Sequence, residues 1–268
     1  MYIIGMILSN QTSNIVFSGS FKHYKAGSPV WKKDWGIAFT ARVEDARVIA
    51  SDYQKAGSHC LRVSYPKTGV GPAQTGVQFP VAFNSIDTMP IKQFNSLYLR
   101  YYLMFEPDFD FRLGGKLPGL MGGGSSWLRS GGDQPDGTNG WTMRFMWRKE
   151  GKAVVYAYIP SGKYGGTEWG LDIDLNFSFI PGKWHCIEEF IRINDIGKQN
   201  GELSVWIDDQ LNLNINDIVY RTVENDAGKI GGIYFSTFHG GNTADWGPVR
   251  DSYIRFGSFV ASTGRLHP

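Results

Sequence analysis

The clearest hydrophobic pattern in the chain is a pair of alternating segments within residues 141–159. Two runs rich in β-branched and aromatic residues flank a short polar segment that contains a glycine, which is the pattern of a β-hairpin. Because side chains alternate between the two faces of a strand, every second residue of each run is expected on the same face. One face is then wholly apolar and predicted to be core: Trp141, Met143, Phe145, Trp147, Val155, Ala157 and Ile159.

The opposite face of this predicted hairpin combines a guanidinium, two phenols and a hydroxyl. With Glu150 at the centre of the turn, Arg144 is expected opposite Tyr156. By the same register, Thr142 is expected opposite Tyr158. Directly opposed side chains on neighbouring strands are close enough to touch. Two interpretations are open at this point: an exposed arginine stacked on tyrosine, which is a common arrangement, or a ligand site backed by a rigid core.

Short alternating segments separated by glycine-rich turns follow one another along most of the chain. Residues 96–105, 184–193 and 201–208 are the clearest further strands, and no stretch combines helical length with a 3.6-residue period. Many short strands at regular spacing are typical of a sandwich or jelly roll. We therefore expect an all-β fold, with residues 1–18 as an N-terminal arm and residues 19–268 as a single domain.

The amino-acid composition supports this fold class and limits the kinds of ligand and metal site. Aromatic residues make up 15% of the 268 residues and glycine occurs 34 times, which favours strands and turns over helices. The net charge of +2 means that an anionic ligand needs a local basic patch. No apolar run reaches membrane-spanning length, and the apolar start lacks the features of a signal peptide. Cys60 and Cys186 are too few for a disulfide framework or a metal site, so a single bridge and two buried thiols both stay open.

Three features outside the hairpin are candidates for chemistry. Lys116 lies in a Gly-Gly-Lys-Leu-Pro-Gly segment, in which glycine permits close approach of the backbone. His239 ends an apolar run before two glycines and is a candidate acid–base group, although a hydrogen-bonded structural histidine is the commoner role. Residues 121–140 are dominated by Gly, Ser, Asp and Asn and are expected to form a long surface loop. Trp127 and Arg129 within this loop suggest a mobile cleft wall.

Several catalytic patterns are missing from the sequence. Glu188 and Glu189 are adjacent, so they point to opposite faces of one strand and do not form the carboxylate pair of a glycoside hydrolase. There is no Gly-x-Ser-x-Gly, Walker or His-Glu-x-x-His motif, and no basic stripe suited to nucleic acid. The candidate catalytic side chains that remain are those of lysine, arginine, tyrosine and histidine. They suit β-elimination from a uronic acid polymer, because cations stabilise the enolate-like dianion and a phenol can move the proton.

Four segments of the sequence resemble polysaccharide lyase family 14, which contains alginate lyases and glucuronate-recognising lyases. They are residues 114–120, 142–147, 156–160 and 235–241. The resemblance implies a β-jelly roll, a two-sheet antiparallel sandwich with a concave substrate cleft. Thr142 stands where a serine is expected, and its hydroxyl is retained as a substrate contact. The catalytic residues that the resemblance implies are Lys116, Arg144, Tyr156 and Tyr158.

From the residues and this resemblance we expect a lyase that cleaves alginate or a glucuronate-containing polyuronate and leaves 4,5-unsaturated uronate ends. Arg144 and Lys116 are expected to neutralise the substrate carboxylate, and Tyr158, or Tyr156 with the roles exchanged, to transfer the proton. We expect an acidic polysaccharide as partner, a monomer, and no cofactor, metal, nucleic acid or membrane. A carbohydrate-binding module and a glycoside hydrolase of the same fold are the alternatives. Substrate contacts are expected from Thr142, His239, Trp127 and Arg129.

Overall fold

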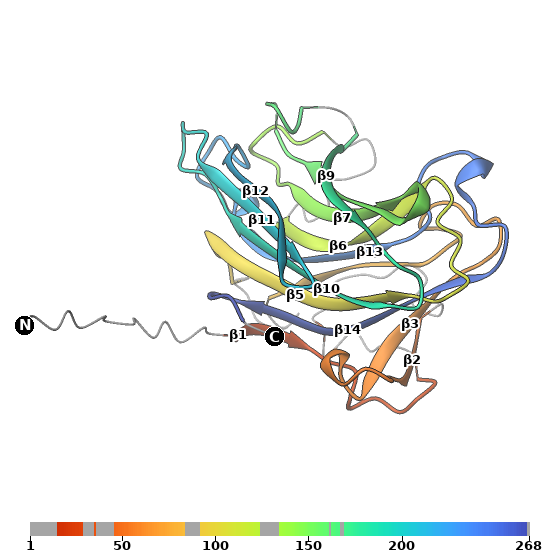
Figure 1. Ribbon diagram of the computed structural model, residues 1–268. Helices are drawn as coiled ribbons and strands as arrows, with labels where there is room; N and C mark the ends of the chain where they lie inside the picture. The colour runs from red at the N-terminus through yellow and green to blue at the C-terminus, as the bar shows by residue number, and fades with distance from the viewer. Residues whose placement is uncertain are drawn as a thin grey trace, which may run out of the picture.

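The computed structural model describes residues 15–28, 35, 46–83, 92–123, 134–160, 162–166 and 169–266. Its strands form two antiparallel sheets packed face to face, as Figure 1 shows. This arrangement confirms the two-sheet all-β sandwich of jelly-roll type that the alternating pattern predicts. In the described part of the chain, no helix has the length and apolar composition needed to cross a membrane.

The larger sheet, sheet A, has eight strands. They are β1 (Ile15–Gly19), β2 (Ala46–Ala50), β3 (His59–Tyr65), β5 (Ser96–Phe105), β10 (Trp184–Arg192), β11 (Gly201–Ile207), β12 (Gln210–Ile218) and β14 (Ser252–Ser262). Their order is β12-β11-β10-β5-β14-β3-β2, and β1 pairs with β14 beside this path.

The smaller sheet, sheet B, has six strands and lies over sheet A in Figure 1. They are β4 (Val77–Ala82), β6 (Gly114–Gly122), β7 (Thr142–Arg148), β8 (Lys152–Tyr158), β9 (Leu171–Ser178) and β13 (Ile230–Thr237). Their order is β4-β13-β6-β7-β8-β9, so β6 and β7 occupy the middle of the sheet.

Two further features bear on the sequence-based expectations. Residues 15–18, expected to be part of an arm, belong to β1, where Ile15 pairs with Ser262 of β14. Residues 1–14 lie outside the described residues. Cys60 and Cys186 are both free thiols, so no bridge joins them.

The inner faces of the two sheets meet in an aromatic-rich core. All seven hairpin residues predicted to face this core are at most 3% exposed. Trp147 packs edge-on against Phe105 of sheet A, with ring centroids 5.6 Å apart. Burying each large apolar side chain contributes about 2 kcal/mol. The hairpin of β7 and β8 is therefore anchored on one face, and its other face points away from sheet A.

Candidate active site

The outer face of sheet B contains a cleft of about 710 Å³. Its described lining includes three basic side chains and no carboxylate. Trp169 and Trp246 also line it. Lysine, arginine and tyrosine side chains from three neighbouring strands thus gather in one hollow, as the sequence predicts. The side chains that strands contribute are Gln78, Lys116, Arg144, Met146, Arg148, Tyr156 and Tyr158.

The strand register brings the predicted hairpin residues together. Arg144 pairs with Tyr156, and Thr142 pairs with Tyr158, which confirms both predicted pairs. The register depends on the turn, where Glu150 and the glycine after it have φ values of 60° and 76°. Positive φ allows the chain to reverse tightly. The turn sequence therefore sets which side chains face each other in the cleft.

The guanidinium of Arg144 is buried in the cleft floor, with 1% of the residue exposed. Its Nη1 donates a hydrogen bond to Ser236 Oγ at 3.2 Å, and Cζ lies 4.9 Å from the Tyr234 ring centroid. Among the described residues no carboxylate pairs with it, and burial lowers the pKa of Arg144. The interpretation as an exposed surface arginine is therefore wrong. An uncompensated buried cation is costly, so this position favours binding of an anion.

Lys116 lines the same cleft as Arg144, from the neighbouring strand β6. Its Nζ is 3.2 Å from the ring centroid of Tyr156 and 2.9 Å from Sδ of Met146. Burial, and then the charges of Arg144 and Arg148, lower the pKa of Lys116 well below its ordinary value. A nearly buried amine with a lowered pKa loses its proton readily and can then accept another.

The two tyrosines stand next to each other on β8. Their ring centroids are 5.2 Å apart and the rings are almost perpendicular, at 77°. Burial, and then Tyr158, raise the pKa of Tyr156, so its phenol is protonated at neutral pH and can donate a hydrogen bond. Gly170 packs against both rings, since a Cβ there would lie 2.7 Å from Tyr158 and 2.9 Å from Tyr156. This close packing limits how far the rings can turn.

Several cleft residues were not predicted from the sequence. Arg148 forms two hydrogen bonds to Asp172, at 2.7 and 2.5 Å, so its charge is already paired. Gln78 accepts a hydrogen bond from Ser236 Oγ at 3.3 Å, next to Arg144. The alternating pattern could have identified Gln78, because it is the polar residue between two buried apolar ones in β4. Nothing in the local sequence pointed to the two tryptophans.

Thr142 and His239 lie below the cleft surface, each with 0% exposure. The His239 ring stacks on Phe109 at 5.6 Å and 11° and packs edge-on against Trp147 at 5.3 Å. Burial lowers the pKa of His239 to about 4, so the ring is neutral at pH 7. His239 thus supports the cleft from behind in this structure. Trp127 and Arg129 lie outside the described residues.

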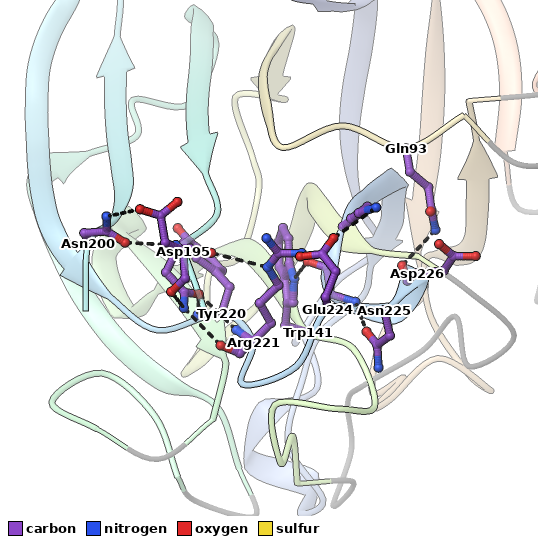
Figure 2. A network of polar contacts seen from close by, with 12 residues as sticks. Gln93, Trp141, Asp195, Asn200, Tyr220, Arg221, Glu224, Asn225 and Asp226 are labelled. Carbon is purple, nitrogen blue, oxygen red and sulfur yellow. Dashed lines mark hydrogen bonds and ion pairs between the residues drawn. The ribbon is translucent and has the colours of Figure 1, made fainter. Parts of the chain in front are cut away.

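A polar network holds the described end of the long loop in place, and Figure 2 shows it from close by. Arg221 forms an ion pair with Glu224 at 2.7 Å. Asn225 Nδ2 donates to the Thr138 carbonyl at 2.7 Å, and the Trp141 indole donates to the carbonyl of residue 228 at 2.9 Å. The last two bonds tie Thr138 and Trp141 to the segment before β13. In the regions that the structure covers, no group of three or more His, Cys, Asp or Glu side chains is placed to hold a metal ion.

Comparison with solved structures supports the same fold. The chain is similar to the marine PL-14 alginate lyase from Aplysia kurodai, with a TM-score of 0.76 and 27% identity over 95% of this chain and 100% of that chain. It is also similar to the alginate lyase Aly36B, with a TM-score of 0.73 and 23% identity over 94% and 98% of the two chains. The endo-β-1,4-glucuronan lyase from the fungus Trichoderma reesei shares the fold at a TM-score of 0.57 and 10% identity, over 94% and 96% of the chains.

A search of curated proteins gave no match. The family model of polysaccharide lyase 14, in contrast, matches residues 53–259. This range includes all four segments whose resemblance was identified from the sequence, together with every strand-borne side chain of the cleft. The chain therefore belongs to polysaccharide lyase family 14.

Proposed function

We propose that this protein is an alginate lyase that cleaves its substrate by β-elimination in the cleft of sheet B. The observation that best supports this activity is Arg144, a buried cation on the cleft floor without a carboxylate partner among the described residues. A uronate unit brings the missing negative charge. A neutral sugar would not supply that charge, and the described cleft lining has no carboxylate pair for hydrolysis.

The first role of the site is to bind and neutralise the substrate carboxylate. Arg144 supplies guanidinium donors, and its Nε has no hydrogen-bond partner among the described residues. The Gln78 side chain lines the same part of the cleft and shares Ser236 with Arg144. Donors aimed at a carboxylate stabilise the extra charge that forms when the neighbouring C5 proton leaves. Together they make that proton more acidic.

Lys116 is the residue that we assign as acceptor of the C5 proton. The sequence suggested that it neutralises the carboxylate, but its lowered pKa favours a different role. Only the neutral amine can accept a proton, and a base is most effective when its pKa lies near the working pH. Tyr156 holds this amine in place, because its ring centroid is 3.2 Å from Nζ.

Tyr158 is the proton donor to the leaving oxygen in this proposal. As Lys116 takes the C5 proton, the C–H electron pair becomes the C4–C5 double bond and the C4–O4 bond breaks. The departing O4 receives the phenolic proton of Tyr158. Proton transfer from the Lys116 ammonium, directly or through solvent, then restores the phenol. Tyr156 is less suited to this step because its ring is engaged by Lys116.

The cleft also offers surfaces for neighbouring sugar units. Trp169 is 55% exposed and Trp246 lines the same cleft. Aromatic rings present large apolar faces, which pack against the C–H faces of sugar rings. The choice of alginate as first substrate rests on the Aplysia kurodai relative, whose identity with this chain is 27%. Glucuronan is the second substrate to test, since a glucuronan lyase has the same fold.

Ultraviolet absorbance of the conjugated product tests this function directly. We expect absorbance to rise when the protein is incubated with alginate, and to rise more slowly or not at all with glucuronan. Binding without absorbance would instead indicate a carbohydrate-binding module. New reducing ends without absorbance would indicate a hydrolase. Either result would reject the lyase proposal.

A further inference from the structure

The strand that contains Lys116 has a bulge directly opposite Arg144. In the pairing of β6 with β7, Leu117 lies opposite Phe145 and Leu120 lies opposite Met143. Two residues of β6, Pro118 and Gly119, therefore face the single residue Arg144. This is the geometry of a β-bulge, which often redirects side chains next to active sites.

The bulge is what allows Lys116 and Leu120 to face opposite sides of the sheet. Without it, residues 116 and 120 would lie on the same face, because side chains alternate with a period of two. With it, Lys116 lines the cleft while Leu117 and Leu120 both join the core between the sheets. A shift of one residue would either bury the amine in the core or expose the leucine.

The main chain of β6 also approaches β7 very closely at this point. A Cβ on Gly119 would lie 1.9 Å from the Met143 carbonyl oxygen and 2.7 Å from Cα of Arg144. Pro118 has no N–H group for the ladder, and proline within a sheet is tolerated at bulges. The bulge therefore lacks part of the usual pairing within sheet B and needs support from elsewhere.

That support comes across the core from sheet A. The hydroxyl of Tyr101 on β5 donates to the Pro118 carbonyl at 3.0 Å. The main-chain N–H of Leu120 donates to Oε2 of Glu189 on β10 at 3.0 Å. Glu189 has 0% exposure and lies between Ile187 and Ile191, which both belong to the core. A carboxyl group is rarely buried in such surroundings without a specific purpose.

We propose that Glu189 and Tyr101 are positioning residues, which hold the β6 bulge from the opposite sheet and so fix Lys116 beside Arg144. This inference rests on the proposed lyase function. Neither residue touches the substrate. Burial raises the pKa of Glu189 to about 8, so the group is neutral at pH 7 and an amide can replace it. Its task is to accept the hydrogen bond from Leu120.

Three substitutions test this proposal by steady-state kinetics on alginate. Glu189→Gln retains a carbonyl oxygen for Leu120 and should keep kcat within about twofold of the wild type. Glu189→Met and Tyr101→Phe each remove one bond to the bulge. Each should lower kcat about tenfold or more with little change in KM, because small displacements of a catalytic group are costly. Tyr101→Phe keeps the ring that stacks on Phe259, so it remains informative if Glu189→Met does not fold.

Tyr220→Phe is the matched control. Tyr220 is 1% exposed, and its hydroxyl donates to the Glu202 carbonyl of β11 at 3.0 Å rather than to β6. It should lower the melting temperature about as much as Tyr101→Phe, because each removes one buried hydrogen bond, with kcat unchanged. Equal loss of kcat in the control would overturn the proposal, and so would wild-type kcat in both Glu189→Met and Tyr101→Phe. A Glu189→Gln variant as poor as Glu189→Met would also overturn it.

The reactivity of Lys116 separates this inference from the lyase function. The rate at which an amine-reactive acylating reagent modifies Lys116, followed by mass spectrometry across pH, reports the pKa of that amine. If the bulge slips, Lys116 gains solvent and its labelling should shift to higher pH in Glu189→Met and Tyr101→Phe. Unshifted labelling in both variants would reject the positioning role. This readout remains valid even if no polyuronate is cleaved, a result that would reject the proposed function alone.

Discussion

Arginine side chains on the outer faces of the two sheets differ in how their charge is balanced. On sheet A, Arg62 and Arg255 both bind Glu106, each with an Nε–Oε1 distance of 2.8 Å. On sheet B, Arg144 has no carboxylate partner among the described residues, although it is more deeply buried, with 1% of the residue exposed. Burial makes an unpaired charge more costly, so stability alone would give the opposite distribution.

This contrast shows which cations have a structural role and which await a ligand. A half-exposed arginine with a carboxylate partner stabilises the sheet modestly and can be replaced with little effect on chemistry. A buried cation without a partner lowers stability, and in the proposed function the substrate carboxylate balances its charge. The predictions below test this division, from the largest expected effect to the smallest.

Replacing Lys116 should have the largest effect. Lys116→Met removes the proposed proton acceptor and should lower kcat by about three to four orders of magnitude, while thermal stability is unchanged or higher. In the wild type, kcat/KM should rise with pH up to the lowered pKa of Lys116, because only the deprotonated amine acts as a base. That acid limb should be absent from the residual activity of the variant.

Lys183→Met provides the control for charge removal. Lys183 is an exposed residue directly before β10, and its Nζ lies 3.5 Å from Asp208. Its replacement should leave both turnover and the pH profile as they are. Full activity of Lys116→Met would refute its role as base.

The two tyrosines should differ in kinetics although they neighbour each other. Tyr158→Phe should lower turnover about a thousandfold and still bind oligosaccharide, because only the donated proton is lost. Tyr156→Phe should keep measurable turnover, since the ring that contacts Lys116 remains. It should bind the oligosaccharide more weakly, because it loses a hydroxyl group that lines the cleft. Kinetics and calorimetric binding of an alginate oligosaccharide measure both effects. The reverse pattern would exchange the roles, and two fully active variants would refute the tyrosine mechanism.

Arg144→Lys should lower turnover about a hundredfold, although it keeps the charge. A planar guanidinium can hold a carboxylate with two parallel hydrogen bonds, which an ammonium cannot. The matched variant on sheet A is Arg62→Lys, which should be fully active. Thermal unfolding of both variants completes the comparison. A variant Arg144→Lys that melts early but is fully active per folded molecule would show that this arginine is structural.

The sequence pattern was sufficient for the part of the site that a single hairpin builds. The alternation of apolar and polar residues predicted the apolar face of β7 and β8. The position of the turn at Glu150 predicted the pairing of Arg144 with Tyr156. Both depend on residues close together in the chain. Their physical causes, the two-residue period and the turn geometry, can be recognised without a structure.

The remaining features depend on contacts between residues far apart in the chain. That Arg144 is buried follows from β13 lying beside β6 and β4 beside β13, and no local pattern indicates this order. In the sequence, Glu189 was considered only with Glu188 as a carboxylate pair, and that pair was rejected. Its hydrogen bond from the main-chain N–H of Leu120 can be recognised only from the packing of the two sheets. The same holds for His239, whose strand-end position suggested chemistry but whose ring packs against Phe109.

The smallest effect is expected from Glu106, and it should concern stability alone. Burial by itself would raise the pKa of Glu106, but hydrogen bonds from Arg62 and Arg255 lower it below its ordinary value. Those two arginines lie directly opposite each other, so Glu106→Gln leaves like charges facing across β3 and β14. We expect a loss of about 2 kcal/mol in the free energy of unfolding at neutral pH, with unchanged turnover on alginate.

The pH dependence of this loss gives a sharper test. A carboxyl group with a lowered pKa in the folded state stabilises the protein above its unfolded pKa, and this contribution is lost as pH falls through the folded value. The difference in unfolding free energy between wild type and Glu106→Gln should therefore be constant above about pH 5 and shrink in more acidic solution. Urea unfolding across this range measures it. A difference that persists at low pH would mean that the shape of the side chain matters rather than its charge. If Glu106→Gln instead lowered turnover without loss of stability, the paired arginines of sheet A would contribute to catalysis. The distinction between structural cations on sheet A and ligand-binding cations on sheet B would then be wrong.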